Sequence, residues 1–208
     1  MEDIFLGLDV NGGGRPFSYG VVAGSRIKAE RGEWISGVRE VGWIKSSVAD
    51  IVALVKRLGP KVTAIDCPRG VPIGLSIECC FAPNSICDCQ IAGTWNGRPQ
   101  TMRKAEHELM SIGISIYPTS KNSTPTWKAL VFSLSSVWEE LGDITDVIET
   151  YPYGIWKRLF PQSPFPWRGG VKNDSFDAVL CGVVAERHHQ GSSEAFGEES
   201  EGKIILPT

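Results

Sequence analysis

The sequence predicts an α/β fold, and three observations support this prediction. The chain opens with hairpin-type strands rich in Val, Ile, Phe, Tyr and Trp, a helix with clear start and stop signals follows, and a buried strand comes directly after that helix. A strand, a crossover helix and another strand in this order form the unit from which α/β sheets are built. With 208 residues, 42% of them hydrophobic, the chain can form one good core, so we expect a single domain over residues 1–208.

The first third of the chain follows that order closely. Three strands form a meander between glycine-rich turns, at residues 4–10, 17–24 and 32–44. Residues 46–59 then place apolar side chains on one helical face, with serines before them and a Gly-Pro pair at the end. The next apolar run, residues 61–66, predicts a buried strand.

The rest of the chain continues the α/β pattern, with two irregular stretches. We expect helices at residues 101–113, 124–142, 153–160 and 173–189, and short strands at 145–152 and 203–207. Residues from about 67 to 100 are rich in Gly, Pro, Cys and Asn, which predicts an irregular Cys-rich insertion that is either functional or mobile. Residues from about 191 to 202 hold four acids and no Lys or Arg, so we expect a flexible acidic loop without an assigned function.

The charge and hydropathy pattern narrows the class of protein. The net charge of −3 argues against a protein that coats nucleic acid. This argument is weakened because, without the acidic loop, the chain keeps 20 of its 24 acids against 21 bases, which gives a net charge of +1. No run of about 18 apolar residues and no charged-then-apolar leader is present. We therefore expect a soluble, cytoplasmic protein without a membrane partner; its oligomeric state is left open.

Three apolar runs each end in a carboxylate. Asp9 ends "FLGLD", Asp66 ends "VTAID" and Glu149 ends "DVIE", each shortly before Gly or Pro breaks the chain. In open α/β sheets, ligands bind beyond the carboxyl ends of the strands. If these strands are neighbours, the three acids converge on one edge of the sheet.

Two more acids open the helix predicted at 173–189. Asp174 and Asp177 lie three residues apart and share a helical face, and the row from Asp177 continues through apolar residues, so Asp177 should point inward. Helix capping explains one of these acids equally well, and a turn or cap role is the ordinary explanation for each acid taken alone. Together the acids predict a site for a hard cation, with Asp9, Asp66 and Asp177 as ligands of Mg²⁺ or Mn²⁺.

Short blocks along nearly the whole chain resemble those of the domain of unknown function 429 family, a group of predicted nucleases. In order, the blocks are "GLDV", "AIDCPRGVP", "RKAEHEL", "GISIYPT", "VIETYPYGIW", "DSFDAVLCGVVAERHHQG" and "EGKIILP". The resemblance implies a ribonuclease H-like fold, in which a central mixed sheet of three antiparallel strands followed by parallel ones is flanked by helices. The DxxDA start of the last helix is similar to that of the RuvC-type resolvases. By that analogy Asp9, Asp66, Asp174 and Asp177 are ligands and Glu149 is an additional family position.

Basic residues near the acidic edge are candidates for substrate binding. Arg69, Arg103 and Lys172 lie in segments predicted near it and could hold phosphates, although scattered surface charge explains them as well. Trp127 lies within an apolar helix pattern, so we assign it to the core rather than to base stacking.

Four cysteines fall within the irregular insertion, at Cys79, Cys80, Cys87 and Cys89. Zinc sites usually use C-x₂₋₄-C pairs, which adjacent and one-apart cysteines fit poorly. Buried or free thiols are therefore favoured over a structural metal site or a disulfide clip, and either way we expect the segment to lie outside the catalytic centre.

The function that these observations favour is hydrolysis of phosphodiester bonds in nucleic acid by a Mg²⁺- or Mn²⁺-dependent nuclease, with the choice between DNA and RNA open. Two alternatives remain. Actin-like ATPases and sugar kinases share this topology and a "GLDVNGGG"-like first strand, but they generally need two such domains. A non-catalytic nucleic-acid-binding or regulatory protein with the same fold is the other.

Overall fold

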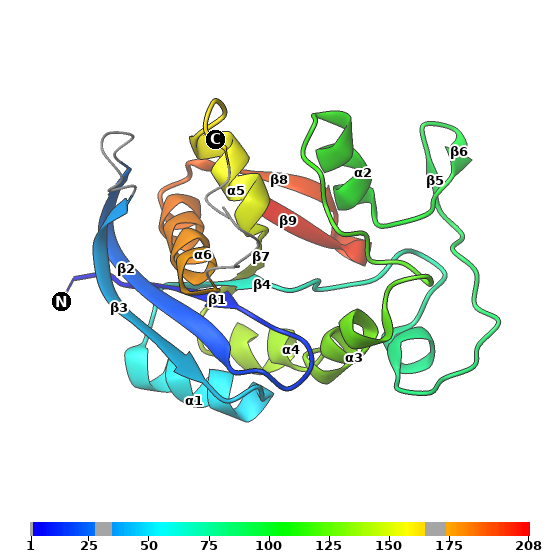
Figure 1. The fold of residues 1–208 in the computed structure, drawn as a ribbon, viewed down its shortest axis with the longest axis horizontal. Helices are drawn as coiled ribbons and strands as arrows, with labels where there is room; N and C mark the ends of the chain where they lie inside the picture. The colour runs from blue at the N-terminus through cyan, green and yellow to red at the C-terminus, as the bar shows by residue number, and fades with distance from the viewer. Residues whose placement is uncertain (1, 28–34, 165–173) are drawn as a thin grey trace.

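The computed structural model describes residues 2–27, 35–164 and 174–208. Its centre is a seven-stranded sheet in the order β3-β2-β1-β4-β7-β9-β8 (Figure 1). The strands of this sheet are β1 (Phe5–Asp9), β2 (Phe17–Ile27), β3 (Ile35–Ile44), β4 (Val62–Asp66), β7 (Asp146–Glu149), β8 (Ser193–Glu198) and β9 (Gly202–Pro207). β1, β2 and β3 pair antiparallel, and β4, β7 and β9 continue the sheet parallel to β1. The predicted fold class, an α/β mixed sheet of three antiparallel and then parallel strands flanked by helices, is confirmed.

Helices cover both faces of the sheet. They are α1 (Val48–Leu58), α2 (Lys104–Ser111), α3 (Pro125–Ser133), α4 (Val137–Gly142), α5 (Pro152–Leu159) and α6 (Asp174–His189). Figure 1 shows α6, α5 and α2 on one face and α1, α4 and α3 on the other, and each face has its own hydrophobic core. Alternate residues of β1 and β4 enter the two cores, as the two-residue period of a strand requires.

Local signals in the sequence explain where α1 begins and ends. The Ser47 side chain accepts a hydrogen bond from the backbone nitrogen of Asp50 at 3.1 Å, which satisfies one of the donors at the helix start. Gly59 ends the helix with φ 62°, a left-handed conformation that glycine adopts at little cost. The chain then enters β4 directly, so the strand–helix–strand order predicted from the sequence is present.

One predicted helix is two helices. We expected a single helix over residues 124–142, but α3 ends at Ser133 and α4 begins at Val137. The hydroxyls of Ser133 and Ser135 bond back to backbone carbonyls three residues earlier, each at 2.9 Å. Serine side chains that compete for backbone acceptors weaken a helix interior, and the chain turns at this point.

The expected acidic loop at 191–202 is wrong. Residues Ser193–Glu198 form β8, paired antiparallel with β9 along its length, and Phe196 packs into the core. A short turn (Glu199–Glu201) connects the two strands, and its Glu201 is fully buried. Two of the four acids, Glu194 and Glu198, lie on this edge strand, where charge discourages pairing with another chain. Composition alone therefore misled the prediction.

The segment between β4 and α2 holds little regular structure. It contains a π-helical turn, η1 (Ile77–Phe81), and a small hairpin of β5 (Thr94–Trp95) and β6 (Arg98–Pro99). Buried Glu201 fastens this segment to the sheet: its carboxylate accepts hydrogen bonds from the backbone nitrogens of Ile73 at 2.8 Å and Lys104 at 2.6 Å, and from the Gln100 amide at 2.6 Å. In the part of the chain that the structure describes, no helix is long and apolar enough to cross a membrane.

Candidate active site

Asp9 and Asp66 are partners in register. They are the last residues of the adjacent parallel strands β1 and β4, so both lie at the carboxyl edge of the sheet. Residues paired in this way point to the same face of a sheet, and the alternation along both strands puts Asp9 and Asp66 on the face covered by α6. Asp9 is fully buried and Asp66 is partly exposed. The convergence predicted for these two strands is present.

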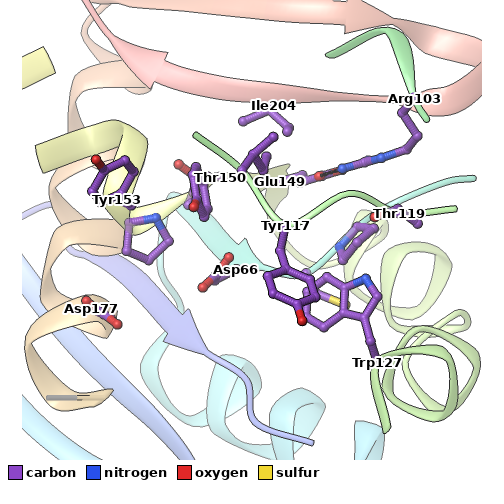
Figure 2. A pocket seen from close by; sticks show the side chains of 15 residues that line it. Asp66, Arg103, Tyr117, Thr119, Trp127, Glu149, Thr150, Tyr153, Asp177 and Ile204 are labelled. Atoms are coloured by element: carbon purple, nitrogen blue, oxygen red, sulfur yellow. Dashed lines mark hydrogen bonds and ion pairs between the residues drawn. The ribbon is translucent and has the colours of Figure 1, made fainter. Parts of the chain in front are cut away.

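Asp177 approaches the same edge from α6. It lies in the first turn of that helix and is fully buried, as its alignment with the apolar row predicted. The helix reaches the sheet closely because Gly7, Gly20 and Gly182 leave no side chain between the two backbones. Figure 2 shows Asp66 and Asp177 pointing into one cavity, the first from the strand end and the second from the helix.

The cavity has a volume of about 280 Å³ and an unusual lining. Asp66 and Asp177 contribute carboxylates to the lining, Arg103 and Glu149 contribute a buried ion pair, and aromatic side chains line much of the remainder (Figure 2). The aromatic residues are Tyr117, Trp127, Tyr151 and Tyr153. A cavity that combines carboxylates with flat aromatic surfaces suits a ligand that combines a planar ring with a group that binds cations.

Asn11 links Asp9 to a further acid, Asp174. Its amide nitrogen lies 3.1 Å from Oδ2 of Asp174 and 3.5 Å from Oδ2 of Asp9, so one side chain joins the end of β1 to the start of α6. Arg15 contacts this group from the surface, with Nη2 donating to the Asn11 carbonyl oxygen at 2.7 Å and Nη1 lying 3.8 Å from Asp174. Asp174 is therefore held near Asp9, and its position supports the predicted cluster.

Glu149 is engaged elsewhere. Both of its oxygens accept hydrogen bonds from the Arg103 guanidinium, at 2.6 and 2.8 Å, and Oε2 also accepts one from the backbone nitrogen of Arg69 at 2.8 Å. Burial raises the pKa of Glu149, with Arg103 acting in the opposite direction. The two side chains form the back wall of the cavity (Figure 2). This pairing argues against Glu149 as a metal ligand, because its oxygens are already occupied by a buried cation.

The predicted substrate-binding role of Arg103 needs correction. Arg103 is 1% exposed and also donates to Glu106 at 3.0 Å, so its guanidinium serves a buried ion-pair network and is not open to a phosphate. Arg69 is exposed near the end of β4, where its guanidinium lies 5.9 Å from the Trp138 ring centroid, and it remains a candidate. Lys172 lies outside the described residues.

The cavity is electronegative. Burial raises the pKa of Tyr151, and the carboxylates of Asp66 and Asp177 raise it further. Burial likewise raises the pKa of Cys67, with Glu149 and Asp66 adding to the effect. Both groups therefore stay protonated at neutral pH. A cation entering the cavity would be attracted by the same carboxylates.

The acids that the structure describes at this edge of the sheet do not lie close enough together to surround a single ion. Among the described residues, one group of metal-binding side chains is compact enough to hold an ion. It consists of Cys79, Cys80, Cys87 and Cys89. Asp9, Asp66 and Asp177 do not form such a group, so a metal bound there would need other ligands, such as water or substrate oxygens.

Sequence reasoning missed the aromatic wall. Tyr151 and Tyr153 follow β7 directly, and their position just beyond a strand end was a usable signal. Tyr117 and Trp127 come from the chain between α2 and α4, where nothing in the local pattern points to a site. Trp127 was assigned to the core, but it reaches both a small hydrophobic cluster and the cavity.

Comparisons with known proteins say little about what this chain does. Neither family models nor curated proteins match the chain. Among solved structures, the chain is similar to the Thermus thermophilus RuvC structure, with 9% sequence identity, a TM-score of 0.44, and coverage of 96% of this chain and 99% of that one. A likeness at this level is no basis for assigning a function, so the site residues themselves have to support one.

Proposed function

We propose that this protein is a nuclease that depends on a divalent metal ion and hydrolyses phosphodiester bonds in nucleic acid at the cavity bounded by Asp66 and Asp177. The observation that supports it most is the register of Asp9 with Asp66 at the carboxyl ends of adjacent parallel strands, with Asp177 facing the same edge from α6. The blocks that resemble those of the domain of unknown function 429 family favour the same assignment, and we expect residues 1–208 to form one ribonuclease H-like domain.

The residues present fit Mg²⁺ or Mn²⁺. The side chains that meet at this edge offer carboxylate oxygens, which hard cations prefer over sulfur or imidazole nitrogen. Mg²⁺ commonly binds one or two carboxylates and completes its shell with water and substrate phosphate, so an open arrangement suits it. When bound, such an ion activates a water molecule and stabilises the leaving oxygen of a phosphodiester.

The other residues of the cavity position the substrate. Tyr117 is 64% exposed and lines the cavity together with the partly buried Trp127 and Tyr153, so bases can stack on these rings. The carboxylates would hold the cation that the phosphate requires in order to bind beside them. Asn11 holds Asp174 beside Asp9. The Arg103–Glu149 pair keeps the back wall rigid and contributes no net charge to it.

The test is cleavage of a panel of single-stranded, duplex, hybrid and branched nucleic acids with Mn²⁺ or Mg²⁺ at low salt, where weak electrostatic binding is least screened. We expect Asp9→Asn, Asp66→Asn and Asp177→Asn to lose both cleavage and calorimetric Mn²⁺ binding, because asparagine keeps the shape and removes the charge that holds the cation. Asp143→Asn is the matched control: this exposed residue precedes β7, at the opposite end of the sheet, and the variant should behave as wild type.

Two outcomes would contradict the proposal. Cleavage that survives all three aspartate substitutions would place the chemistry elsewhere. Mn²⁺ binding without cleavage of any substrate, together with thermal stabilisation by ATP, would favour a nucleotide-binding phosphotransferase. A hollow of about 600 Å³ beside Gly12, Gly13 and Gly14, lined also by Ser46 and Thr126, is where such a nucleotide would bind.

A further inference from the structure

Four cysteine sulfurs meet in the irregular segment between β4 and α2. Cys79 and Cys80 belong to η1, and Cys87 and Cys89 follow a few residues later in chain without regular secondary structure. The Sγ atoms of Cys80 and Cys87 lie 3.3 Å apart, those of Cys79 and Cys89 lie 3.8 Å apart, and all four lie within 4.8 Å of one another. The fold therefore brings together thiols whose spacing in the sequence argued against a metal site.

The spacing of the sulfurs matches a single tetrahedral ion. A Zn–S bond of about 2.3 Å in tetrahedral geometry sets neighbouring sulfurs about 3.8 Å apart. All six cysteines are free thiols, and 3.3 Å is far longer than the disulfide bond length of about 2.05 Å. An iron–sulfur cluster would separate the sulfurs further, because they would bind different irons. We propose that Cys79, Cys80, Cys87 and Cys89 bind one zinc ion as thiolates.

Backbone hydrogen bonds hold the first pair of ligands in place. The Ser76 hydroxyl accepts a hydrogen bond from the backbone nitrogen of Cys79 at 3.3 Å, and the Ser76 carbonyl accepts one from that of Cys80 at 2.8 Å. Ser76 thereby fixes the turn that carries both thiols. This explains how adjacent cysteines serve one ion: the turn directs their side chains, and the usual two-residue spacer is not needed.

A lysine supports the second pair of ligands. Lys121 Nζ donates to the backbone carbonyl of Cys87 at 3.1 Å and to that of Cys89 at 2.9 Å. Four thiolates around Zn²⁺ carry a net charge of −2, and an ammonium held beside the ligands offsets part of it. Lys121 lies in the chain that follows α2, so its hydrogen bonds connect the loop of Cys87 and Cys89 to that segment. The four ligands are therefore positioned by two separate segments, one containing Ser76 and the other containing Lys121.

The ion has a structural role. Four protein ligands close its coordination shell and leave no position for a substrate. The cysteines pack in a small hydrophobic cluster with Phe81 and Val131, and Trp127 packs against the same cluster while lining the acidic cavity. The zinc therefore stabilises an otherwise irregular segment against α3, and through Trp127 it supports one wall of the cavity.

The test is the metal content of the full-length protein purified under reducing conditions. We expect one zinc per chain by elemental mass spectrometry and native mass spectrometry, and thiolate-to-cobalt charge-transfer absorption after exchange with Co²⁺. Cys87→Ser and Cys89→Ser should lose the metal, and Cys87→His should retain it because imidazole is also a zinc ligand. Cys181→Ala is the matched control: this cysteine is buried in α6, outside the group, and the variant should keep its zinc.

Three results would overturn the proposal. Wild-type protein that is folded by circular dichroism and binds no zinc after incubation with excess Zn²⁺ would exclude the site. Disulfides between these cysteines in protein kept reduced would show that the sulfurs meet for another reason. Iron in the purified protein, with the absorption of an iron–thiolate centre, would replace zinc as the ion. None of these measurements depends on nuclease activity, so the zinc site and the proposed function can fail separately.

Discussion

Gly7 of β1 lies directly against Ala178 of α6. A Cβ atom at position 7 would come within 2.0 Å of the Ala178 carbonyl oxygen and 2.2 Å of the Gly182 nitrogen, distances that no real side chain allows. The helix backbone therefore rests on the strand itself. This contact sets how far Asp177, one residue before Ala178, stands from the end of β1.

Replacing Gly7 with alanine should push α6 away from the sheet. Because both contacts are with backbone atoms that have little freedom to yield, we expect Gly7→Ala to lower the free energy of unfolding by about 3 kcal/mol, measured by urea denaturation. Metal-dependent cleavage should fall as well, since Asp177 moves with the helix. Gly142→Ala is the control, because a Cβ there meets nothing within 4 Å. Equal stability of the two variants would contradict this account of the helix packing.

Removing Arg103 should strongly destabilise the protein. Arg103→Met leaves the buried carboxylates of Glu149 and Glu106 without their cation, and breaking a buried ion pair in this way costs about 3–5 kcal/mol. The exposed pair of Arg39 and Glu2 offers the comparison: Arg39→Met should cost less than about 1 kcal/mol. Thermal and urea denaturation would measure both. A small effect of Arg103→Met would mean that Glu149 is protonated in the folded protein.

Changing Glu201 to glutamine should loosen the irregular segment. Glu201 accepts hydrogen bonds from three donors, and a glutamine amide would turn an NH₂ group toward at least one of them. We expect faster hydrogen exchange and proteolysis between Ile73 and Lys104, with a loss of about 2 kcal/mol in stability. Glu199→Gln, at an exposed residue paired with Lys203, should leave both unchanged. Unaltered exchange in the segment would show that other contacts anchor it.

Removing the aromatic ring of Tyr117 should weaken binding of single-stranded nucleic acid if the proposed function is correct. Stacking of a base on an aromatic side chain contributes about 1–3 kcal/mol, so Tyr117→Ala should raise Kd by about fivefold or more in fluorescence anisotropy with a labelled oligonucleotide. Trp43→Ala is the control, since Trp43 is 68% exposed on β3 and lies outside the cavity lining. Equal losses in both variants would mean that exposed aromatic residues bind nucleic acid without a specific site.

The local pattern of the sequence was enough to predict most of the elements and the edge at which the acids gather. Apolar runs that end in a carboxylate before Gly or Pro give strands whose last residue lies at a sheet edge, and Asp9 and Asp66 are such residues. The apolar row of the last helix likewise showed that Asp177 points inward. These predictions succeeded because the periodicity of a strand or helix is visible within a few consecutive residues and does not depend on contacts with other segments.

Tertiary structure alone decided the features that depend on which segments meet. Residues Ser193–Glu198 of the acidic stretch form a strand because β9 lies beside them, and composition does not show which segment a strand pairs with. Glu149 is held by Arg103, which is 46 residues away in the chain. The four cysteine sulfurs come together because a π-helical turn and an irregular loop face each other, although their spacing in the sequence fits no zinc pattern. In each case the sequence determined the chemical groups, and contacts between distant segments determined what those groups bind.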